Sequence, residues 1–470
     1  MNFIVVSSVL VAICSVLVAI LMRKIKNWIP QDLDKFFQSV DRLSSKKLFK
    51  VKFLYKDMYF VNDPNLIHKV LTSDECLEKP QMIYKFFGLS DGFLCCKFNQ
   101  WKRDRKNFSC SFNNVMVNAF TSIFCEIADR MVEKIKEVGC GQKDIIYFTE
   151  RCTISMILAS SFNIFPNDVE NNEERINEVA TAVKIQSTLL CERFRKFHLF
   201  FDALFRHTNH YRKITNLKNY LLEILFKEVD RKNRRIEANN EKVPNFVGNI
   251  FFNKLLFHKN EMTLNQFKDS ITTVIGAGFE TTGTASAHCI LFLAMHPEIQ
   301  EKAYQEILSI YPSNDDEITL ESLTKLEYIE RVMKESLRLG PTVHSIAREA
   351  MRDFELIPNK IAKKGSIFCI NIYGLHRRKD LWGDDAELFN PDRFLPENFE
   401  DKQKYFLPFS VGRRNCIGYR YAYTSFKIMM IKLLRNFKFT TNLKLNEIKF
   451  NRQIALKLTG EHLVMIEQRN

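Results

Sequence analysis

The stretch Phe409-Ser-Val-Gly412-Arg-Arg414-Asn-Cys416-Ile-Gly418 precedes a segment with helical spacing that runs from Tyr419 to Leu434. Its cysteine therefore lies at the amino end of an expected helix, where unpaired N–H groups and the helix dipole create positive potential. Three arginines add formal positive charge nearby: Arg413, Arg414 and Arg420. Both effects lower the pKa of a thiol and favour the thiolate, which is the form that binds a metal.

The residues around this cysteine suit a flat and anionic ligand. Gly412 and Gly418 lack a Cβ atom, so a bulky planar group can approach the backbone closely. Phe409 can pack on such a group, and Arg414 can meet its anionic edge. Haem is a flat, anionic, iron-bearing partner for a single thiolate. The alternative is a lone buried structural cysteine, the usual fate of a free thiol.

The same stretch resembles the haem-binding loop of the cytochrome P-450 superfamily, Phe-x-x-Gly-x-Arg-x-Cys-x-Gly. All five fixed positions are present: Phe409, Gly412, Arg414, Cys416 and Gly418. Average residue usage gives on the order of 10⁻⁴ chance matches in a chain of this length. The resemblance implies that Cys416 is the axial ligand of the iron in haem b, and that the other four residues bind the cofactor.

A long helix is expected upstream, between a capping Thr263 and Pro297. Its middle reads Gly276-Ala-Gly-Phe-Glu-Thr-Thr-Gly283. Each of the three glycines weakens a helix by about 1 kcal/mol relative to alanine. That cost predicts either a close passage over a ligand or a local opening where Thr281 leaves the backbone ladder; a kinked core helix is the alternative.

This helical stretch resembles the oxygen-activating motif of the superfamily. The resemblance implies that Glu280 and Thr281 are catalytic and relay protons to oxygen, which is general acid chemistry. Many family-four members carry, where this chain has Ala277, a glutamate that becomes esterified to a haem methyl. Alanine has no carboxylate, so the haem is expected not to be covalently linked at this position.

Two further groups of residues match the superfamily in the expected order along the chain. Propionate contacts are implied for Trp101, Arg105 and Arg348, although the residues around Trp101 depart from the family pattern. A guanidinium and an indole N–H are suitable carboxylate partners. The resemblance also implies a buried structural ion network of Glu335, Arg338 and Arg393 that supports the haem loop.

The amino terminus predicts a membrane anchor. Residues Phe3 to Leu21 are apolar apart from three serines and are just long enough to span a bilayer. Basic residues follow this run and none precedes it, which favours an uncleaved anchor over a secretory signal, with the rest of the chain cytosolic. The expected division is an anchor over 1–22, a basic linker over 23–45 and a haem-thiolate domain over 46–470.

Composition is consistent with this division. The net charge is +14, from 69 basic and 55 acidic residues, which indicates an anionic partner or a membrane surface. No nucleic-acid motif accompanies the charge. The 12 cysteines contain no Cys-x-x-Cys pair, so neither a disulfide framework nor a zinc site is expected, and a reducing compartment is favoured.

Local patterns predict a few further elements. Val51 to Val61 reads as one strand followed by a helix from Asn65 to Leu71. Leu189 to Phe205 is either core or a surface that dips into the membrane beside the anchor. Leu456 to Ile466 alternates as a hairpin around Thr459-Gly460.

The resemblance covers nearly the whole chain and is closest to the family-four clan of microsomal P-450s. It implies a mainly α fold with small β-sheets, in which haem lies between the Thr281 helix and the Cys416 helix. It also implies mono-oxygenation of a lipophilic substrate (fatty acid, hydrocarbon, hormone-like compound or xenobiotic) at the endoplasmic reticulum membrane. Electrons would come from NADPH through NADPH-cytochrome P-450 reductase, with cytochrome b5 as an optional second partner. Arg413, Arg420 and Lys427, near the haem loop, are expected to form a surface on which an acidic reductase docks. A haem-thiolate isomerase or dehydratase and a non-catalytic haem protein are the alternatives.

Overall fold

The computed structural model describes residues 33–53, 56–165, 172–196, 199, 201–239, 245–313 and 315–469. The anchor expected over residues 1–22 and the first part of the expected linker, residues 23–32, lie outside these ranges. Within them, no helix combines the length and the apolar character that crossing a membrane requires.

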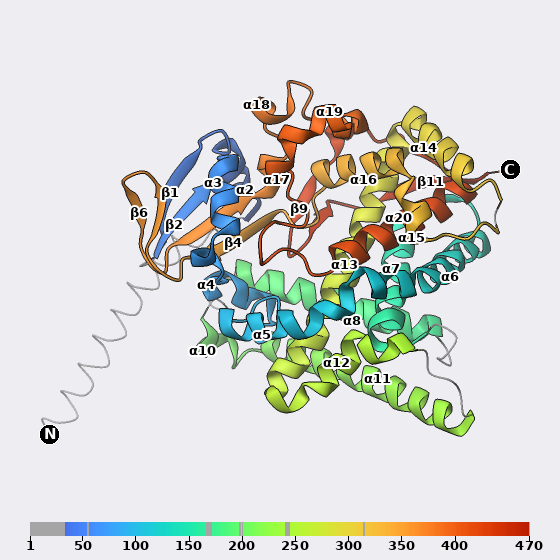
Figure 1. Cartoon of the computed structure of the whole chain (residues 1–470), viewed down its shortest axis with the longest axis horizontal. Coiled ribbons are helices and arrows are strands. Elements are labelled where there is room, and N and C mark those ends of the chain that lie inside the picture. The colour runs from blue at the N-terminus through green and yellow to red at the C-terminus, as the bar shows by residue number, and fades with distance from the viewer. Residues whose placement is uncertain are drawn as a thin grey trace, which may run out of the picture.

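Helices make up most of the described chain, and a small sheet lies at one end of the helical body (Figure 1). The α-helices are α2 (Leu33–Arg42), α3 (Pro64–Thr72), α4 (Gln81–Tyr84), α5 (Phe98–Phe108), α6 (Asn114–Val138), α7 (Ile145–Phe162), α8 (Asn172–Arg195), α10 (Asp202–Phe205), α11 (Asn209–Asn239), α12 (Phe251–Phe257), α13 (Leu264–Met295), α14 (Pro297–Ile310), α15 (Leu320–Thr324), α16 (Glu327–Leu339), α17 (Ile372–Leu375), α18 (Lys379–Trp382), α19 (Pro396–Phe399) and α20 (Tyr419–Asn436). The strands are β1 (Leu48–Phe53), β2 (Lys56–Val61), β3 (Gly141–Asp144), β4 (Ser345–Glu349), β5 (Phe354–Ile357), β6 (Lys360–Ala362), β7 (Ile367–Asn371), β8 (Phe437–Thr440), β9 (Phe450–Arg452), β10 (Leu456–Leu458) and β11 (Leu463–Gln468).

The strands form small and mostly antiparallel sheets. The largest has the order β1-β2-β7-β4, in which only β2 and β7 run parallel. A second sheet has the order β3-β11-β8, and two further pairs are β9 with β10 and β5 with β6. The expectation of a mainly α fold with small β-sheets is confirmed.

For two segments, the sequence predicted strands but not the partners with which they pair. The run from Val51 to Val61 forms parts of two strands, because β1 and β2 pair with each other as a hairpin. The segment Leu456–Ile466 does not close on itself: β10 pairs with β9, whereas β11 pairs with β3 and β8. Alternation along a strand reports which face is buried, and it leaves the identity of the partner strand open.

Residues 33–42, which lie in the expected linker, form α2 and pack against the folded domain. Val40 is buried, and the Phe37 ring meets the ring of His344 edge-on at 4.9 Å. Asp41 pairs with the buried Arg452 of β9. The described part of the linker therefore belongs to the domain.

The central helix α13 begins and ends where the sequence predicts. Thr263 Oγ1 accepts the N–H of Gln266 at 3.2 Å, and Gln266 Oε1 accepts the N–H of Thr263 at 3.0 Å, which is a complete capping box. The helix stops at Met295, two residues before Pro297, because a proline cannot continue the hydrogen-bond ladder.

Two of the mid-helix glycines allow α13 to approach α7. A Cβ atom on Gly278 would lie 2.6 Å from Ile157 Cδ1, and one on Gly283 would lie 2.9 Å from the Cα atom of Glu150. A Cβ on Gly276 would meet nothing within 4 Å. Helix packing therefore explains Gly278 and Gly283, and only Gly276 leaves room beside the helix.

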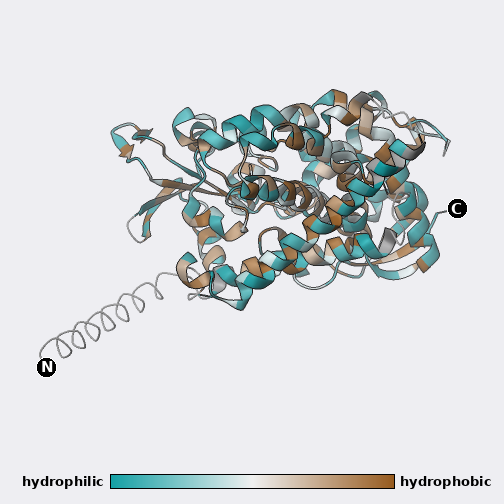
Figure 2. Cartoon of the chain, turned by 90° about the horizontal axis from the view of Figure 1, so that it is seen from below, coloured by the Kyte–Doolittle hydropathy of each residue, from teal (hydrophilic) through white to brown (hydrophobic). Residues whose placement is uncertain are grey.

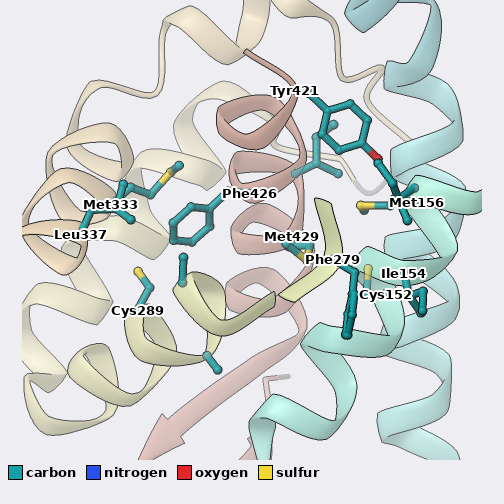
Figure 3. Packing of buried hydrophobic residues seen from close by; sticks show 14 of the residues in the cluster. Cys152, Ile154, Met156, Phe279, Cys289, Met333, Leu337, Tyr421, Phe426 and Met429 are labelled. Atoms are coloured by element: carbon teal, nitrogen blue, oxygen red, sulfur yellow. The ribbon is translucent and has the colours of Figure 1, made fainter. Parts of the chain in front are cut away.

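The core lies where α7, α13, α16 and α20 meet. Figure 3 shows Ile154 and Met156 from α7, Phe279 from α13, Met429 from α20 and Leu337 from α16 within one cluster of buried side chains. The surrounding helices carry both hydrophilic and hydrophobic residues, as expected of helices with one buried face (Figure 2). This core fixes the mutual placement of α13 and α20, the two helices that carry the candidate site.

Candidate haem site

The loop before α20 has a tightly determined backbone. The N–H of Cys416 donates to the carbonyl of Phe409 at 2.9 Å, and the N–H of Asn415 donates to the carbonyl of Gly412 at 3.1 Å. Ser410 and Gly412 both adopt positive φ values, +59° and +76°. A Cβ atom on Gly412 would lie 2.1 Å from the carbonyl oxygen of Leu71, so this glycine lets the loop pass under the end of α3.

Gly418 behaves differently from Gly412. A Cβ atom placed on Gly418 would meet nothing within 4 Å, so the backbone beside Cys416 is open to a bulky group. The expectation that a glycine permits close approach of a flat ligand therefore fits Gly418, whereas Gly412 serves the path of the loop.

The Cys416 thiol differs from the cysteines of the core in its accessibility. Its side chain is exposed, in contrast with the core cysteines Cys76, Cys95, Cys96, Cys152, Cys191 and Cys289. Protein atoms nevertheless crowd around it. The loss of water contact caused by these atoms raises the pKa of the thiol, while the N–H of Gly418 and the charge of Arg105 lower it. A bound metal cation supplies the further positive charge that deprotonates a coordinating thiol.

The arginines expected to act on this thiol lie elsewhere. Arg413 is at the surface and pairs with Asp74 at 2.7 Å. Arg420 stacks on its neighbour Tyr419, and Arg414 points away toward α5. Arg105 is the cation that reaches the thiol, since it donates to the carbonyl and the side chain of Asn415 at 2.8 and 2.7 Å.

Arg414 and Arg348 are buried beside the loop. The guanidinium of Arg414 lies 4.3 Å from the ring of Trp101 and donates to the carbonyls of Leu77 and Cys96. Arg348 is only 1% exposed and donates to Ser410 Oγ at 3.4 Å, and its Nε atom has no hydrogen-bond partner. Burial lowers the pKa of both groups.

A third buried cation, Lys79, was missed by the sequence reasoning. Its ammonium donates to the hydroxyl of Tyr84 at 3.0 Å, and its pKa lies well below the usual value because of burial and of the nearby Arg348 and Arg414. No spacing rule marks a lysine that precedes a proline, so only the fold reveals it.

Lys79, Arg348 and Arg414 together form a buried cation group. In the described part of the chain, no acidic residue makes an ion pair with any of the three. Buried like charges without a counter-charge are costly. A ligand with two carboxylates at one edge, such as haem, supplies that counter-charge and a partner for the Nε atom of Arg348. The residues present therefore fit the cofactor.

One strip of α13 is accessible between two buried stretches of the helix, 269–275 and 282–294. Ala277 is exposed and Gly276 and Thr281 are half-buried, whereas Ile275 and Thr282 are buried. The helix is continuous here, so the expected opening at Thr281 is absent from the structure. The Thr281 hydroxyl instead donates to the carbonyl of Ala277 at 2.7 Å, a local bond within the helix.

Glu280 points to a different side of α13 from this strip. Its carboxylate is buried, pairs with Lys457 of β10 at 2.7 Å and accepts from Ser187 of α8 at 3.3 Å. Consecutive helical residues are separated by about 100° around the axis, which places the acid and the alcohol on different faces. The structure thus brings Thr281, but not the carboxylate of Glu280, to the accessible strip.

The three residues expected in a supporting ion network come together. Arg338 makes two bonds to the Glu335 carboxylate, at 2.6 and 2.7 Å, and Arg393 Nε lies 3.5 Å from the same carboxylate. Arg393 also pairs with Asp385. Arg338 donates to the carbonyl of His376, whose ring accepts the N–H of Leu407 at 3.0 Å, so the network connects α16 to the start of the Cys416 loop.

Comparison with known proteins agrees with this geometry. A family model described as Cytochrome P450 matches residues 21–464. The chain belongs to the cytochrome P450 family. A similar protein is the probable cytochrome P450 313a4 of Drosophila melanogaster, 29% identical over 87% of this chain and 84% of that protein. Another is the cytochrome P450 4c21 of Blattella germanica, 29% identical over 94% of this chain and 88% of that protein.

As a member of this family, the P450 is a haem-thiolate monooxygenase. Its resemblance to the family-four clan is consistent with these relatives, which carry the numbers 313 and 4. The haem supplies the iron centre that activates O₂. The protein supplies the residues that hold the cofactor, place the substrate and carry protons.

Proposed function

We propose that this P450 hydroxylates a lipophilic small molecule, either a fatty acid, a hydrocarbon, a hormone-like compound or a xenobiotic. One atom of O₂ enters a C–H bond of the substrate and the other leaves as water, with two electrons from NADPH and two protons from solvent. The observation that carries the proposal is the accessible strip of α13. Gly276 and Ala277 offer no polar side chain there, and the Thr281 hydroxyl is already bonded to the Ala277 carbonyl.

Different residues of the chain would bind the cofactor and transfer protons. Cys416 would hold the iron through its sulfur, and Phe409, which packs against Tyr423 at 5.1 Å, would keep the loop apolar on the same side. Lys79, Arg348 and Arg414, supported by Trp101, would bind the carboxylates of the cofactor. Thr281 would hold a proton donor above the substrate, and Glu280 would pass protons toward it.

The electron donor is proposed to be NADPH-cytochrome P-450 reductase, with cytochrome b5 as an optional second partner. Arg413 and Arg420 are exposed near the Cys416 loop and suit an acidic docking surface. Lys427, a third residue expected on this surface, does not belong to it. Its ammonium is buried between Glu330, at 2.8 Å, and the carbonyl of Leu323, at 2.9 Å.

The proposed location is the endoplasmic reticulum membrane, with one anchor at residues 1–22 and the catalytic domain in the cytosol. The support for this location is the apolar run followed by basic residues. An apolar substrate dissolved in the bilayer would then be close to the enzyme.

The test is a metabolite screen with the full chain, reductase and NADPH, starting with medium and long fatty acids. We expect a hydroxylated product that requires both NADPH and O₂. A product formed from a peroxide without NADPH would instead identify an isomerase or dehydratase. A protein that binds haem and lipophilic ligands but consumes no NADPH with any substrate would contradict the proposal.

A further inference from the structure

A cluster of buried charged groups lies behind the accessible strip of α13, on the side of α7, α8 and β10. Glu150 of α7 is fully buried and pairs with Lys184 of α8. Glu280 of α13 pairs with Lys457 of β10. The Lys184 side chain is 40% exposed, so the cluster extends from the protein surface to the residue that precedes Thr281.

The two carboxylates lie close together because α7 and α13 touch at a glycine. The nearest atoms to a Cβ built on Gly283 include the Cα and Cγ atoms of Glu150, at 2.9 and 3.1 Å. Thr149 Oγ1 donates to the carbonyl of Gly283 at 2.9 Å, and Thr153 Oγ1 donates to the carbonyl of Phe279 at 3.0 Å. These bonds fix Glu150 against the turn of α13 that contains Glu280.

Several polar atoms in this region have no hydrogen-bond partner among the protein atoms. They are Glu150 Oε1, Thr284 Oγ1, His288 Nε2 and His462 Nε2, whereas the other Glu150 oxygen and Glu280 Oε1 are engaged by Lys184 and Lys457. Glu280, Thr284 and His288 are four residues apart and therefore share one face of α13. Native proteins seldom leave so many buried polar atoms unsatisfied, and ordered water is the usual partner.

We propose that Glu150 is a proton carrier that connects solvent at Lys184 with Glu280 through buried water. The inference rests on the proposed function, because mono-oxygenation consumes two protons for each molecule of water released. A proton enters beside Lys184, resides on the Glu150 carboxylate and passes along bound water to the Glu280 carboxylate. Glu280 returns to its ionised form when water carries the proton on to the Thr281 hydroxyl, which gives up its own proton to the oxygen atom that leaves as water. Glu150 acts through Glu280 and does not touch the substrate.

The electrostatics of Glu150 suit this role. Burial raises the pKa of its carboxyl, and the negative charge of Glu280 raises it further, whereas the charges of Lys184 and Lys457 lower it. The imidazole of His462, near both lysines, has a pKa well below its usual value and adds no charge at neutral pH. A carboxyl group with a raised pKa exchanges protons more readily near neutral pH than an exposed one.

The decisive variant is Glu150→Gln, which keeps the shape of the side chain and removes the proton site. With the reconstituted holoenzyme we expect product formation to fall by on the order of 10²-fold, the contribution of a positioned proton donor. The solvent isotope effect should rise, and haem and substrate binding should persist. Glu150→Asp retains a carboxyl group and should restore most of the rate. Glu126→Gln, which alters an exposed carboxylate paired with Arg130, is the matched control and should change nothing.

A second measurement does not depend on turnover. Because the pKa of Glu150 is higher in the folded protein than the unfolded value of 4.5, its contribution to stability falls as pH rises from that value through the folded pKa. Glu150→Gln has no carboxyl group at this position and does not lose stability in this way. The difference in unfolding temperature between the variant and the wild type should therefore shift in favour of the variant as pH increases. Lys184→Gln should shift the pH–rate profile of the enzyme to higher pH, because the Glu150 pKa rises further.

The outcomes separate the relay from the proposed function. A wild type without NADPH-dependent product would overturn the proposed function, and the unfolding series would still test the titration of Glu150. An active Glu150→Gln enzyme with wild-type rate and isotope effect would show that Glu150 is only structural. If that variant does not fold, an unchanged pH–rate profile in Lys184→Gln would overturn the relay.

Discussion

At the scale of single residues, Lys79 is the most informative, because an anionic ligand would account for its burial. Its ammonium lies near two other buried cations and donates to a single neutral hydroxyl. Lys79→Met should therefore stabilise the protein without haem and weaken haem binding. A lost bond to a carboxylate is worth roughly 1.5–3 kcal/mol, or about ten- to a hundredfold in affinity.

The measurement for Lys79→Met is the rate of haem transfer to an excess of a strong haem acceptor, together with the unfolding temperature with and without haem. Lys102→Met, which changes an exposed lysine on α5, is the control. Equal transfer rates in the two variants would remove Lys79 from the cofactor site.

Cys416 carries a second prediction at this scale. Cys416→His should replace the sulfur ligand by an imidazole, and the reduced carbon-monoxide complex should move its main absorption band from the thiolate-type to the imidazole-type position. A thiolate-type spectrum in this variant would mean that another cysteine binds the iron. Cys140→Ser, at another exposed cysteine, should leave the spectrum unaltered.

Ala277 leads to the third prediction, which concerns the attachment of the cofactor. This residue is exposed on the accessible strip of α13, where an ester bond to a haem methyl would need a carboxylate. Glu280 is held by Lys457 on a different face of the helix and cannot replace it. Extraction with acidified organic solvent should release all the haem, as judged by mass analysis of the polypeptide. Haem that stays with the protein would require another carboxylate near the ring edge.

At the scale of secondary-structure elements, the contact between α7 and α13 gives a matched pair of substitutions. Gly283→Ala places a methyl group 2.9 Å from the backbone of Glu150, which cannot move aside without shifting α7. We expect a loss of about 1–3 kcal/mol, as for other overpacked sites. Gly276→Ala, seven residues earlier, meets nothing and should gain up to about 1 kcal/mol from helix propensity.

Thermal unfolding of the two variants under identical conditions measures this difference. A similar effect of both substitutions would mean that the contact between the two helices is adaptable. It would also weaken the argument that Glu150 is held at a fixed place beside Glu280.

The elements also show what the sequence could and could not predict. The limits of α13 followed from Thr263 and Pro297 because capping and helix termination are local events. The pairing of β11 with β3 was missed because it depends on a partner far away in the chain, and β10 pairs instead with the strand just before it, β9. Glu335, Arg338 and Arg393 were found through motif order, whereas Lys79 belongs to no motif and Lys427 was wrongly expected at the surface.

At the scale of the whole molecule, the positive charge has more than one use. Arg413 and Arg420 remain exposed near the Cys416 loop, whereas Lys79, Arg348, Arg414 and Lys427 are buried. Charge reversal of Arg413 and Arg420 to glutamate should slow electron transfer from the reductase by about tenfold and reduce its salt dependence. Stopped-flow reduction at several ionic strengths measures both quantities. If the salt dependence is unaltered, the reductase docks elsewhere.

The buried cation group has a consequence for the folding of the newly made chain before haem binds. Repulsion among these buried cations would oppose folding until a dianion neutralises them, so haem would act as a missing part of the core. Newly made chains would then mature only as fast as haem is supplied. When haem runs short, the cell would lose this enzyme through degradation of unfinished chains.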